Sequence, residues 1–160
     1  MRIITQRDKP LPVGTKDSYL AAHREFLGRY TFSHFVTVNP VAEVSMESFR
    51  RRLKHFHAMV DRKLLGKFWL EYPERRTFFF AYFQNDPYIH VHLLVKVLPE
   101  YQEEFEALCC PILRKLFSST KAVQVERLRS QERCGRYVSR DAHMHAMEGF
   151  IVSPEFVERR

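Results

Sequence analysis

The chain has little of what a secreted or membrane protein needs. It has only three cysteines, Cys109, Cys110 and Cys134. Their spacing fits no metal site, and an odd count with an adjacent pair makes a poor disulfide framework, so we expect a reducing compartment. The sequence also lacks an apolar run of the roughly 18 residues that a membrane helix needs, and its first residues lack the apolar core of a signal peptide. We therefore expect a soluble, cytoplasmic protein with no membrane contact.

Internal repeats, low-complexity tracts and interdomain linkers are also missing from the 160 residues. A chain of this length with 45% hydrophobic residues can bury one core. We expect a single domain over residues 1–160, with its core at about 31–147 and with peripheral segments at 1–30 and 148–160.

Acidic residues are too few to balance the basic ones. The formal net charge is +7 and the sequence pI is about 9.5. A balance this basic indicates a polyanionic partner, of which nucleic acid is the usual one.

The hydrophobic periodicity predicts alternating strands and helices. We expect helices through 19–26, at about 46–65, at about 99–117 and at about 131–146, with Pro111 kinking or splitting the third. We expect strands at 31–38, 67–72, 77–84, 88–97 and 121–128. This order predicts an α+β fold, with one largely antiparallel five-stranded sheet and helices packed on it.

The strand at 88–97 carries the most informative pair of residues, His90 and His92. Side chains two apart on a strand share a face, so both imidazoles can approach one ion. On a helix, residues two apart point about 200° away from each other, which excludes the other pairs as chelates. Those pairs are His55/His57 and His143/His145.

A metal site needs a third protein ligand, and Mg²⁺ or Mn²⁺ prefers an oxygen. If the loop after the strand at 77–84 holds three residues, Tyr82 pairs with His90 and Gln84 shares the histidine face. A four-residue loop would instead place Gln84 on the sheet face opposite the histidines. Gln84 is therefore the first candidate for the third ligand, with Asp141 and Glu126 behind it.

A second cluster lies in the last predicted helix. Tyr137, Arg140 and Asp141 stand at i, i+3 and i+4 and share one helix face. A tyrosine hydroxyl, a cation for a phosphate and a carboxylate are what phosphoryl transfer to tyrosine requires.

Three segments together resemble the ordered motifs of the HUH endonucleases, which comprise rolling-circle replication initiators, relaxases and single-strand transposases. The segments are Phe35-Val36-Thr37-Val38, His90-Val91-His92-Leu93 and Tyr137-Val138-Ser139-Arg140. The motif spacing and the single tyrosine are most similar to the single-tyrosine replication initiators.

This resemblance implies a ferredoxin-like or RRM-like sheet on which His90 and His92 present Mg²⁺ or Mn²⁺ to a scissile phosphate. Tyr137 would attack that phosphate, with Arg140 beside it, and form a 5′-phosphotyrosine and a free 3′-hydroxyl. The implied function is nicking and joining of single-stranded or hairpin DNA, initiating rolling-circle replication of a plasmid or phage. A single-strand transposase of the same superfamily and a non-catalytic nucleic-acid-binding module are the alternatives.

The chain departs from the family pattern at two places. Replication initiators carry a carboxylate eight residues before the first histidine, where this chain has Tyr82. Their helix motif ends in lysine, where this chain has Arg140. The related transposases place a glutamine ligand four residues after the tyrosine, where this chain has Asp141.

Basic side chains for the DNA backbone are available near these motifs. The candidates are Arg75, Arg76, Arg127, Arg129, Arg133 and Arg136. Further partners implied by a replication initiator are a host helicase and a polymerase, and the protein would act as a monomer or homodimer.

Overall fold

The structure is a computed structural model in which residues 16–85, 88–118, 120–139 and 150–153 are described. The α-helices are α1 (Lys16–Leu27), α2 (Met46–Leu65), α3 (Gln102–Leu116) and α4 (Gln131–Ser139). Short 3-10 helices occupy Gly66–Phe68, Pro73–Arg75 and Pro99–Tyr101. The strands are β1 (His34–Pro40), β2 (Phe78–Asn85), β3 (Ile89–Lys96), β4 (Thr120–Arg127) and β5 (Phe150–Val152).

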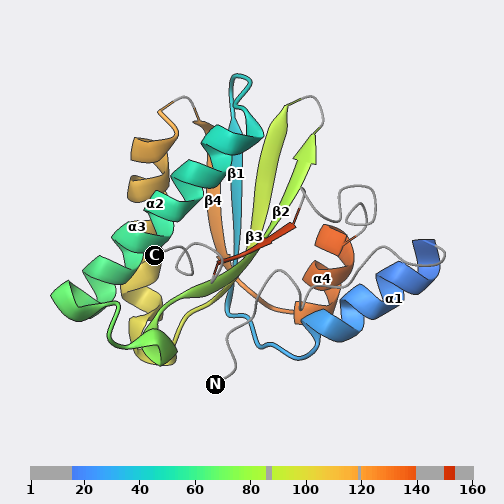
Figure 1. Ribbon diagram of the computed structural model, residues 1–160, viewed down its shortest axis with the longest axis horizontal. Helices are drawn as coiled ribbons and strands as arrows, with labels where there is room; N and C mark the ends of the chain where they lie inside the picture. The colour runs from blue at the N-terminus through green and yellow to red at the C-terminus, as the bar shows by residue number, and fades with distance from the viewer. Residues whose placement is uncertain (1–15, 86–87, 119, 140–149, 154–160) are drawn as a thin grey trace.

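The strands form one antiparallel sheet in the order β4-β1-β3-β2-β5 (Figure 1). The chain runs β1-α2-β2-β3-α3-β4, and β3 is the middle strand of the sheet, with β1 on one side and β2 on the other. The expected α+β class with a five-stranded antiparallel sheet is confirmed, and the arrangement is ferredoxin-like.

Helices cover both faces of this sheet (Figure 1). On one face, α2 and α3 pack on a core that includes Val36 and Leu93. On the other face, α1 and α4 contribute Phe26 and Val138 to a second cluster, which also contains Leu94. Neighbouring residues of β3 therefore enter opposite cores, as strand periodicity requires.

The longest described helix, α2, follows its sequence signals closely. Ser45 caps it by accepting a hydrogen bond from the backbone N–H of Ser48 at 3.2 Å. It ends at Gly66, whose φ of 75° is a conformation that favours glycine. Its apolar stripe, with Phe49, Leu53 and Val60, is buried. None of the described helices is both long and apolar enough to cross a bilayer.

The prediction of a strand at 67–72 is wrong. These residues form a 3-10 helix and turns, and Phe68, Leu70 and Tyr72 are exposed. The place beside β2 is taken by β5 instead, with Val152 opposite Phe80. The expected number of strands is right, but the fifth comes from a C-terminal segment that shows no strong pattern in the sequence.

Two further expectations need adjustment. Pro111 does not split its helix, because α3 runs from Gln102 to Leu116 with the proline inside it. The last helix begins as expected, where Ser130 Oγ accepts a hydrogen bond from the backbone N–H of Arg133 at 3.3 Å. Its expected extension over 140–146 lies outside the described residues.

Segments outside the expected core of 31–147 also belong to the packed structure. Tyr19 and Phe26 of α1 are buried in the second cluster, and Ile151 of β5 is buried in the first. The described parts of the two end segments are therefore not peripheral, because each supplies side chains that a sheet face needs.

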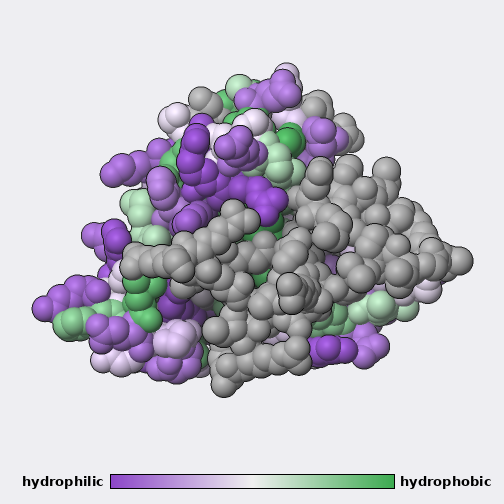
Figure 2. All heavy atoms as spheres, viewed as in Figure 1, coloured by the Kyte–Doolittle hydropathy of each residue, from purple (hydrophilic) through white to green (hydrophobic). Residues whose placement is uncertain are grey.

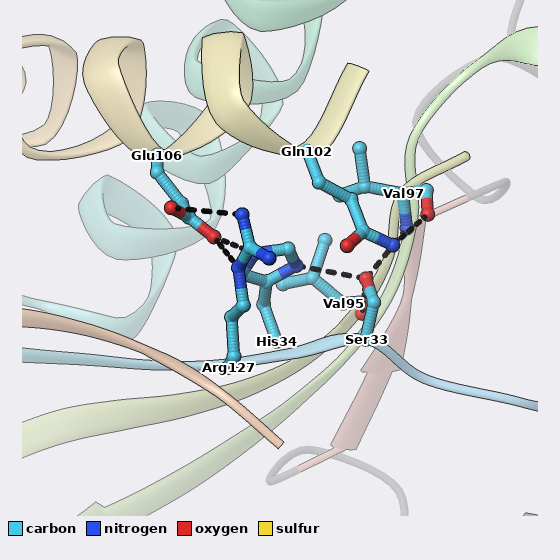
Figure 3. Close-up of polar contacts among 7 residues, drawn as sticks. All are labelled: Ser33, His34, Val95, Val97, Gln102, Glu106 and Arg127. Carbon is cyan, nitrogen blue, oxygen red and sulfur yellow. Dashed lines mark hydrogen bonds and ion pairs between the residues drawn. The ribbon is translucent and has the colours of Figure 1, made fainter. Parts of the chain in front are cut away.

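A polar network ties α3 to the sheet on the α2/α3 face (Figure 3). The buried His34 lies with Nε2 2.8 Å from Glu106 Oε1 and with Nδ1 2.8 Å from Ser33 Oγ. Arg127 of β4 pairs with the same carboxylate at 2.5 Å. The Arg127 guanidinium and the His34 ring hold the pKa of Glu106 below its usual range. The network links β1, α3 and β4 through one acceptor, the carboxylate of Glu106.

A second network joins the end of α2 to the start of β2. Asp61 is fully buried and forms an ion pair with Arg76 Nε at 2.7 Å. It also accepts hydrogen bonds from the backbone N–H and the hydroxyl of Thr77, at 2.9 and 2.7 Å. His57, one turn earlier, lies 3.2 Å from the same carboxylate. Asp61 therefore holds the segment after α2 against the helix.

Replacing Asp61 with alanine leaves the buried Arg76 charge without its partner. We expect the free energy of unfolding, measured by urea denaturation, to fall by about 3–5 kcal/mol. Lys63→Ala, an exposed position on the same helix, should change it by no more than about 0.5 kcal/mol. A loss below about 1 kcal/mol for Asp61→Ala would contradict this role.

Candidate functional site

The two candidate metal ligands lie on β3, between β1 and β2. His92 stands opposite Thr37 on one side and Tyr82 on the other, and His90 stands opposite Gln84. Tyr82 and Gln84 thus share the face of the two histidines, which we call the histidine face. The pairing differs by two residues from the expected one, because β2 extends to Asn85, which stands opposite Ile89 at the start of β3. A shift of the pairing by two residues leaves each side chain on the same face of the sheet.

The ring of His92 is held on two sides by β1. Its Nδ1 lies 3.0 Å from the hydroxyl oxygen of Thr37, within hydrogen-bond distance. The ring of Phe35 stacks on it, with centroids 5.3 Å apart and an interplanar angle of 15°. If Nδ1 donates its proton to Thr37, the lone pair is on Nε2. That nitrogen is buried and has no hydrogen-bond partner among the described residues.

The second histidine faces the amide of Gln84. His90 Nε2 lies 3.0 Å from Gln84 Oε1, and the rings of His90 and His92 are 5.3 Å apart and nearly perpendicular. The amide nitrogen of Gln84 is buried with no partner in the described part of the chain. Two imidazoles and an amide oxygen therefore gather at the start of β3.

Tyr82 occupies the place where the resemblance would put a carboxylate. Its hydroxyl lies 2.7 Å from Nε2 of the buried His23 on α1. Burial, with a smaller contribution from nearby Tyr19, raises the pKa of Tyr82 well above its ordinary value. The phenol therefore stays protonated and supplies no anionic oxygen, which leaves the Gln84 amide as the candidate oxygen donor on this strand.

The candidate nucleophile lies beside the histidines. Tyr137 of α4 is 46% exposed, and its ring centroid is 5.3 Å from that of His92 and 6.3 Å from that of Phe35. Both contacts are edge-to-face, which aromatic rings favour. Residues 45 positions apart are thus brought into contact by the packing of α4 on the sheet.

The other predicted site residues are distributed differently. Arg140 and Asp141 lie outside the described residues. Glu126 is exposed on the histidine face of β4, opposite Phe35, and is separated from β3 by β1. In the described residues, no three side chains of histidine, cysteine, aspartate or glutamate are grouped to hold a metal.

The six predicted DNA-binding arginines do not form one surface. Arg129, Arg133 and Arg136 are exposed in or just before α4, near Tyr137. Arg127 pairs with Glu106 beneath α3, on the other face of the sheet. Arg75 and Arg76 follow α2, and the Arg76 side chain is only 8% exposed.

Sequence reasoning did not assign roles to Thr37, Phe35 or His23. The first two lie in a segment that the resemblance covers, and the pairing of β1 with β3 would have linked them to His92. Nothing in the sequence marks His23, because its contact with Tyr82 depends on how α1 packs on the sheet.

Comparison with known proteins adds no relative: the chain matches no family model, no curated protein and no solved structure.

The burial of His92 has a measurable consequence. Desolvation, with a smaller contribution from His90, lowers the pKa of His92 to about 4. Because this is below the ordinary value of about 6.5, the unfolded chain binds the proton more readily. The contribution of His92 to stability is therefore lost as the pH falls from about 6.5 toward about 4.

We expect an NMR titration of the His92 ring to give a pKa of about 4. His90→Ala should raise it, because the charge of the neighbouring imidazole is removed. An unchanged or lower value in His90→Ala would show that the two rings do not interact.

Proposed function

We propose that this chain is an HUH-type endonuclease, which nicks and joins single-stranded DNA in a metal-dependent reaction with Tyr137 as the nucleophile. One observation carries the proposal. A partly exposed tyrosine on α4 is in ring contact with His92, whose buried Nε2 has no hydrogen-bond partner among the described residues. A strand-borne histidine pair and a helix-borne tyrosine are the parts that this chemistry needs.

The residues present fit a divalent ion. His90 Nε2, His92 Nε2 and Gln84 Oε1 would hold it, and water and a DNA phosphate would complete the octahedral shell that Mg²⁺ or Mn²⁺ prefers. When bound, the ion would supply Lewis-acid polarisation of the scissile phosphate. Thr37 and Phe35 keep the His92 ring in place, so little reorganisation of that ligand is needed.

The reaction follows from the position of Tyr137. Its Oη attacks the scissile phosphorus, and the bond between phosphorus and the 3′ oxygen breaks. The phenol loses its proton, and the leaving 3′ oxygen gains one. The products are a 5′-phosphotyrosine on the protein and a free 3′-hydroxyl, which can reverse the reaction or prime synthesis. This outcome suits the initiation of rolling-circle replication of a plasmid or phage, with a host helicase and polymerase acting afterwards.

The positive charge of the chain supports a DNA substrate, which would be single-stranded or a hairpin. The chain has a net charge of +7, and three exposed arginines lie in or next to the helix that carries Tyr137. Each phosphate contact releases counterions, so binding should weaken steeply with salt.

A non-catalytic DNA-binding module on the same sheet is the second candidate. The observation that favours it is Tyr82, which bonds to His23 and provides no carboxylate for a metal. Metal binding distinguishes the two candidates.

Tyr137→Phe should abolish the covalent protein–DNA adduct. The variant lacks the attacking oxygen, while its ring contacts with His92 and Phe35 remain possible. The measurement is a denaturing gel of protein mixed with single-stranded and stem-loop oligonucleotides in Mn²⁺. Tyr88→Phe is a matched control, because Tyr88 is 44% exposed next to β3. Undiminished adduct in Tyr137→Phe would exclude Tyr137 as the nucleophile.

Replacing both His90 and His92 with alanine should weaken Mn²⁺ binding by at least about tenfold, measured by electron paramagnetic resonance without DNA. Loss of even an outer-shell partner of a metal ligand typically costs about 10–100-fold in metal affinity, so loss of two ligands should cost at least as much. His55→Ala, at an exposed position on α2, should bind Mn²⁺ as the wild type does. If the double variant binds Mn²⁺ as tightly as the wild type, a non-catalytic DNA-binding module is the better description of this protein.

A further inference from the structure

A tryptophan lies against two arginine side chains just beyond the end of α2. Trp69, the one tryptophan of the chain, comes directly after the 3-10 helix Gly66–Phe68 that follows α2. The guanidinium carbon of Arg76 lies 4.6 Å from its ring centroid, and that of Arg62 lies 5.5 Å from it. These distances are typical of cation–π contacts.

The position of this indole is fixed from inside the protein. Arg76 is held by the buried Asp61, which also accepts two hydrogen bonds from Thr77. A buried carboxylate is costly unless it is paired, so the pair holds Arg76 firmly against the ring. Arg62, in contrast, is exposed.

A hollow opens beside the ring. Its volume is about 380 Å³, and Arg62, Gly66, Lys67 and Trp69 line it. The lining thus combines one flat aromatic face with two exposed cations and contains no acidic residue. The Lys67 ammonium also lies over the ring of the exposed Phe68, at 4.7 Å.

The helix leading to the hollow is basic on its outer side. Arg51, Lys54, Arg62 and Lys63 are exposed along α2. Apart from the buried Asp61, the one acid of this helix is Glu47 in its first turn. Figure 2 shows hydrophilic side chains over the side of the molecule where α2 lies in Figure 1, with apolar surface among them at the lower left.

We propose that this hollow binds a nucleotide of a single-stranded nucleic acid, with the base against Trp69 and the phosphate between Arg62 and Lys67. Aromatic faces combined with cations are how proteins hold single strands without reading their sequence. An acidic peptide would satisfy the two cations but carries no planar base that could pack against the indole.

This site is separate from the proposed nicking site. The hollow lies at the end of α2, which covers the sheet face opposite the histidine face. A strand that reaches both sites must pass around an edge of the sheet. A short oligonucleotide can therefore occupy the hollow without Tyr137, and the inference does not depend on the nicking reaction.

The single tryptophan makes the test direct. Tyr137→Phe protein, which cannot form the proposed adduct, is titrated with single-stranded oligothymidylate of about five nucleotides while tryptophan fluorescence is recorded. We expect saturable quenching that weakens as salt rises. In the same protein carrying Arg62→Ala and Lys67→Ala, we expect the affinity to fall by at least about tenfold.

The matched control is Arg114→Ala with Lys115→Ala. This pair removes the same two types of charge from the exposed last turn of α3, on the same side of the sheet. It should change the affinity by less than about threefold. An equal loss in both double variants would overturn the proposal, because only net charge would then matter. Absence of quenching, or equal quenching by polyglutamate, would also overturn it. Adduct formation by Tyr137, assayed separately, is unaffected by either result.

Discussion

The candidate site depends on the antiparallel register of β3 with its two neighbours. That register puts His92 between Thr37 and Tyr82, and His90 opposite Gln84. A slip by one residue would move every one of these side chains to the other face of the sheet. The apolar residues that alternate with the histidines prevent the slip, because Val91 and Leu93 are buried under α2 and α3.

The two sheet faces serve different purposes in our proposals. On the histidine face, α4 brings Tyr137 against the ring of His92, whose Nε2 is buried, and α1 places His23 at the Tyr82 hydroxyl. On the other face, α2 packs its apolar stripe into the first core and displays a basic outer surface. The buried Asp61 joins this helix to β2 and at the same time fixes Arg76 beside Trp69. The internal ion pair between Asp61 and Arg76 thus also positions the cation that packs on Trp69.

Prediction from sequence worked where local patterns and burial agree. The helix at 46–65 combines a cap, an apolar stripe and a terminal glycine, and the structure has it with those limits. Prediction failed at 67–72, where a cluster of aromatic residues is typical of a strand. The edge of β2 was already filled by β5, so those residues had no strand to pair with.

Local sequence patterns are enough to predict the fold class, the strand that carries the histidine pair and the face that the two imidazoles share. These properties depend on periodicity, which each segment carries within itself. Three contacts come from tertiary packing instead: Thr37 and Phe35 hold His92, His23 lies within hydrogen-bond distance of the Tyr82 hydroxyl, and Tyr137 lies against His92. Such contacts join residues far apart in the chain, and their formation depends on the register of strands and the packing of helices, which no single segment encodes.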